Sequence, residues 1–322
     1  MTIAKVQQTL KAKPWGVVDL TPWANASNAS DRIGEIWYEP PSHVTKPSAL
    51  QLKLLFTSRP LSIQVHPDDA LAKSIGLPRG KTEAWYVLDA APDAQVALGL
   101  QQATTTQDLR SAVHAGTIVN LMAWKPAASG DSFFVPAGTI HAIGAGLVIA
   151  EIQQRSEATF RLFDHGSDRE LHIEDGLCAA STTSVAARTL HHPLTTERHV
   201  LVSCPYFVFE RIELPGGSSW ALNAQTETWC LILCGDGDIA AIGVAQGDCV
   251  FVDREYANIR TGTNGITLLI AYAQARPDVK RLVRNQQRAI PSEAQSSLAA
   301  DARKSNKLAT TVAIRNVEGV TP

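Results

Sequence analysis

One stretch of sequence decides the expected fold of this chain, Gly130-Asp131-Ser132-Phe133-Phe134-Val135-Pro136-Ala137-Gly138-Thr139-Ile140-His141. Residues 131–135 favour a β-strand, and Pro136 and Gly138 are typical of a tight turn. His141 then begins the returning strand. We therefore expect an antiparallel β-barrel in which an imidazole at the start of a strand can bind a metal.

Segments upstream of this stretch supply further candidate ligands. A run of alternating apolar and polar residues puts Gln64 and His66 on one face, because side chains of a strand alternate with a period of two. A second strand-like run follows, in which Lys81 and Glu83 share a face. That strand adds a carboxylate and a cation to the group.

Together these residues predict a zinc site. Each of them alone is better explained by an ordinary hydrogen-bonded or solvated side chain. The joint set offers two imidazoles, one carboxylate and one neutral amide oxygen, which suits Zn²⁺ and leaves room for a substrate. The expected metal ligands are Gln64, His66, Glu83 and His141.

Composition indicates an ordinary globular protein. The chain has 322 residues, 45% of them apolar, and a formal net charge of -2, so nucleic acid is not an expected partner. Met1 to Lys13 lacks the apolar core of a signal peptide, and no apolar run approaches the length of a membrane span. We expect a cytoplasmic protein without a membrane partner, whose five cysteines are reduced.

An internal repeat predicts two related β-units. Residues 130–135 recur as 247–252, and Thr-Glu-Ala-Trp at 82–85 recurs as Thr-Glu-Thr-Trp at 226–229. The first copy holds additional residues between its paired strands. Residues 104–116 explain part of this excess, because they show helical spacing, begin with threonines that can cap a helix and end at a glycine.

The second copy is expected to bind no metal. It has Asn258 at the position of His141, and Glu227, which matches Glu83, lacks imidazole companions and is expected to be structural or solvated. The expected domains are an N-terminal metal-binding unit with the inserted helix, a C-terminal metal-free unit and a partly disordered extension that could serve as a docking or oligomerisation arm. Their boundaries are 1–185, 186–275 and 276–322.

The motifs carry a family resemblance. Gly130-x5-Pro136-x-Gly138-x2-His141 resembles the second signature of the cupin barrels. The wider set resembles the short form of type I mannose-6-phosphate isomerase over roughly residues 10 to 275, with its pieces in family order. The pieces are residues 13–16, 33–37, 52–55, 61–69, 80–83, 136–144 and 151–154.

This resemblance implies a fold and a set of roles. The fold would be mostly β, with two cupin-like antiparallel barrels, each a double-stranded β-helix, and a few helices. Gln64, His66, Glu83 and His141 would bind one Zn²⁺ per chain. Arg161 would be the active-site arginine, while Ser62 and Lys53 would contact the substrate phosphate. Phe160 and Phe163 stand where tyrosines are common in the family, so contacts to the sugar are expected to differ.

The expected activity is the interconversion of mannose 6-phosphate and fructose 6-phosphate through an enediol-type proton transfer. Lys81 is the candidate general base, since a neighbouring metal would lower its pKa; the alternative is that it only neutralises nearby carboxylates. Two other functions stay open, a non-catalytic sugar-phosphate-binding protein and a metal enzyme of another class on the same barrel. The sequence does not indicate the oligomeric state.

Overall fold

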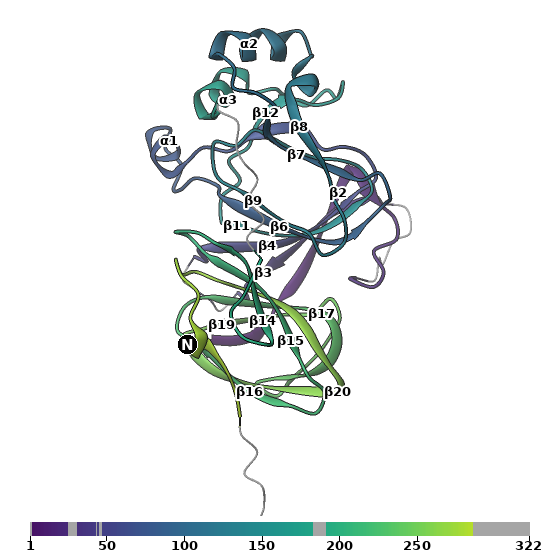
Figure 1. Cartoon of the computed structure of the whole chain (residues 1–322), viewed down its shortest axis with the longest axis vertical. Helices are drawn as coiled ribbons and strands as arrows, with labels where there is room; N and C mark the ends of the chain where they lie inside the picture. Colours follow the sequence, from purple (N-terminus) through teal and green to yellow (C-terminus); the bar gives the residue numbers. More distant parts are fainter. Residues whose placement is uncertain (1, 25–30, 43, 45–46, 183–190, 286–322) are drawn as a thin grey trace, which may run out of the picture. The chain divides into compact units, whose positions relative to one another are not determined.

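The computed structural model describes residues 2–24, 31–42, 44, 47–182 and 191–285. Within this part of the chain there are 21 strands and three α-helices, so the expected mostly β fold is confirmed. The strands form two groups (Figure 1). We call the described residues of 7–182 the first β-unit, and residues 2–5 together with 191–284 the second β-unit; residues 1–284 pack as one compact unit.

The first β-unit consists of two antiparallel sheets. One has six strands in the order β2 (Gln7–Val17), β3 (Ile33–Glu39), β4 (Leu50–Thr57), β11 (Leu147–Gln154), β6 (Glu83–Ala90) and β9 (Ser132–Val135). The other has five, in the order β12 (Phe160–Phe163), β5 (Ile63–Val65), β10 (His141–Ile143), β7 (Gln95–Leu100) and β8 (Met122–Pro126).

The stretch from Gly130 to His141 folds as its composition predicts, because β9 is followed by a turn and then by β10. The amide of Thr139 donates to the carbonyl of Pro136 at 3.1 Å and closes the turn. Gly138 has a φ of 85°, a conformation that only glycine adopts without strain. The turn thus carries the chain from the six-stranded sheet to the five-stranded sheet.

Three short helices accompany the first β-unit: α1 (Asp69–Ser74), α2 (Thr106–His114) and α3 (Ile173–Ala179), with a 3-10 turn η1 (Ile118–Leu121). The side chain of Asp68 caps α1 by accepting from the amide of Leu71. Helix α2 confirms the predicted insertion: Thr105 caps it, and Leu109 and Val113 are buried one turn apart. These helices lie at the first β-unit in Figure 1.

The second β-unit is one ten-stranded sheet. Its main path runs β1 (Thr2–Lys5), β19 (Cys249–Asp253), β17 (Thr228–Ile239), β20 (Glu255–Tyr272), β15 (Val208–Leu214), β14 (Arg198–Ser203) and β13 (His192–Pro193). Beside this path, β16 (Ser219–Ala224) pairs with β20 and β21 (Leu282–Arg284), and β18 (Ile242–Ala245) pairs with β17.

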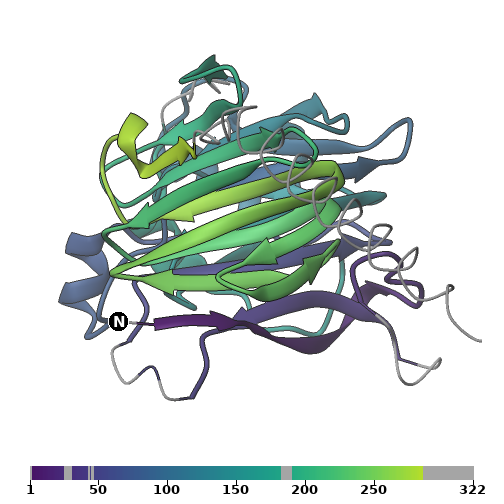
Figure 2. The ribbon, with the colours of Figure 1, turned by 90° about the horizontal axis from the view of Figure 1, so that it is seen from below.

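Both ends of the described chain contribute to this sheet, which the sequence did not predict. Strand β1 pairs with β19, so the N-terminal residues lie against the second β-unit before the chain enters the first (Figure 2). The 3-10 turn η2 (Val279–Arg281) and β21 belong to the segment that the sequence assigned to a partly disordered extension. Arg281 in that segment is buried, and residues 286–322 of the extension lie outside the described residues.

The repeat is present in three dimensions. Strand β9 pairs with β6 in the first unit and β19 with β17 in the second. Each pairing follows a glycine with positive φ, Gly130 at 93° and Gly247 at 88°. The registers differ by one residue, because Glu83 lies opposite Val135 whereas Thr228, and not Glu227, lies opposite Val252.

Apolar side chains fill each unit and also the contact between them. Strand β4 is buried along its whole length: Leu55 packs inside the first unit, while Leu52, Leu54 and Phe56 join a core shared with the second unit. From the second unit, Trp229 joins that shared core. The six-stranded sheet is therefore covered on both faces.

The expected domain boundaries and the expected absence of a membrane partner stay predictions. The domain boundaries at residues 185 and 275 fall within a chain that packs as one compact unit through residue 284. None of the described helices is long and apolar enough to span a membrane.

Candidate active site

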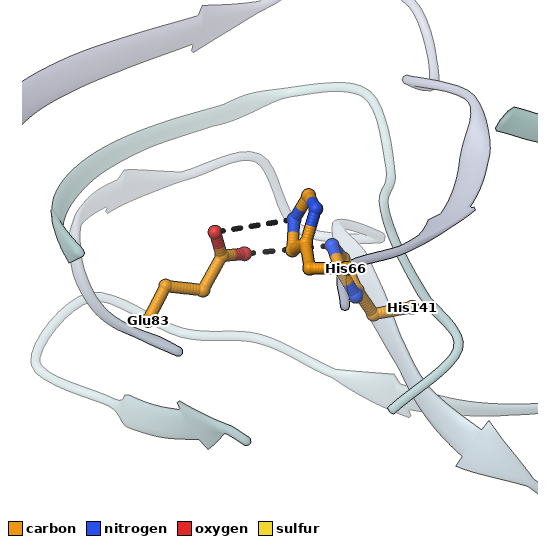
Figure 3. A group of neighbouring side chains, drawn as sticks. All are labelled: His66, Glu83 and His141. Atoms are coloured by element: carbon orange, nitrogen blue, oxygen red, sulfur yellow. Dashed lines mark ion pairs between the residues drawn. The ribbon is translucent and has the colours of Figure 1, made fainter. Parts of the chain in front are cut away.

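Three side chains from different strands converge inside the first β-unit (Figure 3). His66 follows β5, Glu83 begins β6 and His141 begins β10. Each is 1% exposed, and their candidate ligand atoms all lie within 4.8 Å of one another. Among the described residues this is the single group of three or more His, Cys, Asp or Glu side chains that could hold a metal.

The imidazoles turn the same nitrogen toward the carboxylate. Nε2 of His66 lies 3.4 Å from Oε2 of Glu83, and Nε2 of His141 lies 3.4 Å from Oε1. The opposite nitrogens have backbone partners: Nδ1 of His66 donates to the carbonyl of Ala158 at 2.8 Å, and Nδ1 of His141 donates to that of Thr139 at 2.9 Å. Such hydrogen bonds fix the tautomer in which Nε2 carries the free lone pair.

Gln64 completes the predicted ligand set. It is the cross-strand neighbour of His141, and its amide nitrogen lies 3.2 Å from Nε2 of that residue. Its oxygen accepts from the hydroxyl of Ser62 at 3.1 Å. Because the amide oxygen and nitrogen can exchange places by a half-turn, the oxygen can equally face the cluster.

Glu83 gives the strongest sign that these residues fit a metal. Its Oε1 accepts from the indole of Trp85 at 3.1 Å. Its Oε2 is buried and lacks a well-directed hydrogen-bond donor among the described residues, although Nζ of Lys81 lies 3.0 Å away. A buried carboxylate oxygen normally has a partner, and a cation between the imidazoles and Glu83 would provide one.

The protonation states of His66, His141 and Glu83 also fit a metal site. Burial lowers the pKa of His66 to about 3, and nearby Lys81 acts in the same direction. Burial also lowers the pKa of His141. Burial would raise the pKa of Glu83, but Lys81 and His66 outweigh it and hold that pKa well below its ordinary value. Two neutral imidazoles and one carboxylate are the protonation states that bind a divalent metal.

Lys81 is buried beside this cluster, as predicted, but it lies in the loop before β6 and not on a strand face shared with Glu83. Its Nζ lies 3.3 Å from Nε2 of His66. Burial lowers its pKa, but Glu83 and Glu151 outweigh burial, so the net shift is upward. The protein side chains alone therefore shift this pKa in the direction opposite to that required of a base. Only an additional positive charge, such as a metal ion at Glu83, would lower it.

Glu151 is a site residue to which sequence reasoning assigned no role. On β11 its Cα partners are Lys53 on β4 and Trp85 on β6, and its carboxylate lies 3.8 Å from Nζ of Lys53. Burial and Glu83 raise the pKa of Glu151 to about 7. The available signal was a single acidic residue in the apolar strand that begins at Leu147.

Lys53 extends the site along the six-stranded sheet. It is buried, and burial lowers its pKa. Its Nζ lies 4.5 Å from the centre of the ring of Trp37 on β3, whose indole donates to Glu35. Lys53 therefore lies between an aromatic face and the carboxylate of Glu151.

Arg161 is paired by strand register with a residue of the cluster, but its guanidinium contacts a backbone carbonyl outside the cluster. On β12 it is the Cα partner of Gln64. Its guanidinium donates to the carbonyl of Glu170 at 2.9 Å, and its side chain is half-buried. The structure thus brings five predicted site residues together: Gln64, His66, Lys81, Glu83 and His141. Ser62 joins them through Gln64, and Lys53 through Glu151. Arg161 lies at the edge of this group.

Comparison with known proteins identifies relatives. The chain is 37% identical to mannose-6-phosphate isomerase ManA of Bacillus subtilis over 183 residues and 36% identical to a mannose-6-phosphate isomerase of Streptococcus mutans over 210 residues. These matches span 53% and 61% of this chain, but only 57% and 64% of the two relatives. A third, "Probable mannose-6-phosphate isomerase GmuF" of Bacillus subtilis, is 31% identical over 70% of this chain and 75% of its own length. No family model matches the chain.

Solved structures share the fold. The crystal structure of mannose 6-phosphate isomerase from Bacillus subtilis superposes with a TM-score of 0.73 at 24% identity, covering 84% of this chain and 100% of that one. A zinc-bound mannose 6-phosphate isomerase superposes with a TM-score of 0.67 at 13% identity, covering 85% of this chain and 100% of that one. The sequence relatives and the shared fold agree, and the chain belongs to the mannose-6-phosphate isomerase family.

Proposed function

We propose that this protein is a metal-dependent isomerase that interconverts mannose 6-phosphate and fructose 6-phosphate. The observation that carries the proposal is the buried cluster of His66, Glu83 and His141, which adjoins a buried ammonium group. The ammonium group of Lys81 neutralises only the one carboxylate, and the Nε2 lone pairs of the two neutral imidazoles beside it are the donors that a divalent cation would bind. The names of the relatives indicate the sugar phosphate.

The metal we propose is one Zn²⁺ per chain, bound by Gln64, His66, Glu83 and His141. The nitrogen and oxygen donor set suits zinc, and a structural neighbour is named as zinc-bound. When bound, zinc would supply positive charge that stabilises the anionic oxygen developing during enolisation. With a single carboxylate among four ligands, the site keeps a net positive charge, which favours an anionic intermediate.

Proton transfer between C1 and C2 of the sugar requires a group that removes a proton and returns it. Two buried groups border the cluster and can exchange a proton, Lys81 and Glu151. Lys81 lies nearer to the expected ligands, at 3.0 Å from Glu83. Glu151, with a pKa of about 7, can carry a proton near neutral pH. We assign the general base to Lys81 and a supporting proton-carrying role to Glu151.

The substrate phosphate requires cations and hydroxyl donors. We propose that Lys53 and Ser62 bind it, with Arg161 contributing a guanidinium near the reacting carbons. Arg161 is partly exposed and its guanidinium donates to a backbone carbonyl, so its side chain can turn toward Gln64, its cross-strand neighbour. The gain would be a charge-assisted hydrogen bond.

The architecture we propose is two cupin-like barrels, with the chemistry in residues 1–185 and a metal-free unit in residues 186–275. The equivalent strand pairs β6–β9 and β17–β19 support this division. A cytoplasmic location remains part of the proposal.

The test is zinc content measured together with isomerisation of mannose 6-phosphate, before and after chelation. Near-stoichiometric zinc and turnover that chelator abolishes and added zinc restores are the expected results. Bound zinc without turnover would refute the isomerase and favour a sugar-phosphate-binding protein. Turnover that survives complete removal of metal would refute the role of zinc.

A further inference from the structure

Glu227 in the second β-unit is the repeat counterpart of Glu83. The local geometry agrees with the sequence repeat, because each carboxylate accepts a hydrogen bond from the indole two residues later. The distance is 3.1 Å from Trp85 to Glu83 and 2.9 Å from Trp229 to Glu227. The two glutamates therefore make the same hydrogen bond with the tryptophan that follows them.

The remaining contacts of Glu227 reach across to the first β-unit. Its Oε1 accepts from the hydroxyl of Ser48 and from the amide of Leu50 at 3.0 Å, and its Oε2 accepts from the amide of Ala49 at 2.6 Å. Ser48 is 6% exposed and Leu50 1%. One carboxylate thus holds three successive residues at the entrance to β4.

Two parts of the candidate active site are connected to these three residues: the loop that leads to Glu83, through Arg79, and the strand that carries Lys53. The carbonyl of Ala49 accepts from the guanidinium of Arg79 at 2.9 Å and from the amide of Arg155 at 2.9 Å. Arg79 lies two residues before Lys81 in the loop that leads to Glu83. Lys53 lies three residues after Leu50 on β4.

Further hydrogen bonds connect the loop that contains Arg79 and Lys81 to the segment of the expected ligand His66. The amide of Lys81 donates to the carbonyl of Pro67, next to His66, at 3.0 Å. The hydroxyl of Ser156 donates to the carbonyl of Arg79 at 3.1 Å. The loop that presents Lys81 and Glu83 is therefore held at both its start and its end.

We propose that Glu227 is a positioning residue for the active site of the first β-unit, a role that rests on the function proposed above. By holding Ala49, it sets the place of Arg79 and so of the loop that ends at Lys81; by holding Leu50, it sets the start of the strand that carries Lys53. The metal-free unit thereby supports the reaction through the carboxylate that corresponds to a metal ligand in the other unit.

Replacement of Glu227 by glutamine tests this with little change in volume. A glutamine oxygen can still accept from Ser48, Leu50 and Trp229, but its amide group then faces the amide of Ala49, and two donors cannot bond. The matched control is Glu213→Gln in the same unit, a half-exposed carboxylate whose ion-pair partner is Arg211. Ser48→Ala is a milder second variant that removes one donor only.

The expected result for E227Q is a kcat/KM for mannose 6-phosphate lowered about 10-fold with zinc content retained, since a remote change that misplaces reacting groups by about 1 Å can cost up to about 10²-fold. E213Q should match the unaltered protein, and Ser48→Ala should fall between them. A kcat/KM for E227Q within twofold of the control would overturn the proposal.

Amide hydrogen exchange separates positioning from general stability and needs no activity. Positioning predicts faster exchange in E227Q at Leu50 to Leu54 and at Gly80 to Thr82, with β15 and β20 unchanged. Uniformly faster exchange throughout the second β-unit, or none in the two named segments, would overturn the proposal. If the unaltered protein turns over no substrate, the proposed function fails, whereas the local exchange result still decides the role of Glu227.

Discussion

The two β-units use equivalent carboxylates for different purposes. Both Glu83 and Glu227 accept from a tryptophan two residues later in the chain. Around Glu83 two imidazoles and an ammonium group gather, whereas Glu227 receives backbone amides from the opposite unit. The repeat thus preserves the hydrogen bond between glutamate and tryptophan, and the neighbouring strands decide whether the glutamate is suited to bind a metal or to hold a chain segment.

The charged interiors differ in the same way. In the second unit, Arg198 and Glu210 form a doubly hydrogen-bonded pair at 2.8 Å, both fully buried, and the hydroxyl of Tyr272 donates to the same glutamate at 2.5 Å. That network is satisfied within the protein. In the first unit, one oxygen of Glu83 lacks a well-directed donor among the described residues. The Arg198–Glu210 pair is therefore suited to stability, and the cluster around Glu83 to ligand binding.

The largest expected effect comes from giving the first unit the residue that the repeat has in the second. His141→Asn removes one imidazole while keeping a polar side chain of moderate size. We expect zinc content to fall strongly and turnover to drop by at least about 10²-fold, since a group that stabilises developing charge contributes this much. Metal analysis and steady-state kinetics measure both. A variant that keeps zinc and activity would remove His141 from the ligand set.

Lys81→Met separates metal binding from proton transfer. The change removes the ammonium group but keeps an unbranched chain in the buried site. We expect kcat to fall by about 10²–10⁴-fold, the usual contribution of a general base or acid, with zinc content unchanged. Lys73→Met in α1, which is exposed, serves as the control. Unchanged kcat in Lys81→Met would mean that this lysine only neutralises carboxylates.

Glu210→Gln tests the assignment of stability to the second unit. It leaves the guanidinium of Arg198 buried without its anionic partner, and breaking a buried pair in this way costs about 3–5 kcal/mol. We expect the free energy of unfolding to fall by about that amount, while the kcat of the remaining folded protein stays unchanged. Denaturant titration and kinetics below the unfolding transition provide the measurements. A loss of activity without a loss of stability would contradict the comparison.

The smallest expected effect concerns pH and the loop after β12. Burial would raise the pKa of Asp164, but hydrogen bonds from Arg169 and Ser167 outweigh it and lower the pKa below 3.8. Because the native pKa is depressed, the stabilisation is present above about pH 3.8 and is lost as the pH falls through the native value. Asp164→Asn should therefore lower Tm slightly at neutral pH, with a difference that shrinks in acid. A difference independent of pH would contradict this.

Much of the candidate site could be predicted from the sequence because it depends on local periodicity. Short-range spacing grouped Gln64 with His66 and Lys81 with Glu83, although His66 follows β5 and Lys81 lies in the loop before β6, and turn residues placed His141 at the start of a strand. Glu151 was missed as a site residue because its partners, Lys53 and Trp85, lie on strands that are far away in sequence. The net direction of the Lys81 pKa also depended on such distant neighbours.

The sequence by itself determined the mostly β fold, the two related β-units, the capped helix at 106–114 and the candidate ligand types, since these depend on repeated segments and on residue spacing within a few turns or strands. Only the tertiary structure decided that β1 joins the second unit, that Arg281 is buried and that Glu227 faces Ser48 and Ala49. Strand pairing and burial couple residues far apart in the chain, and their free energies depend on which surfaces meet. No local pattern encodes that choice.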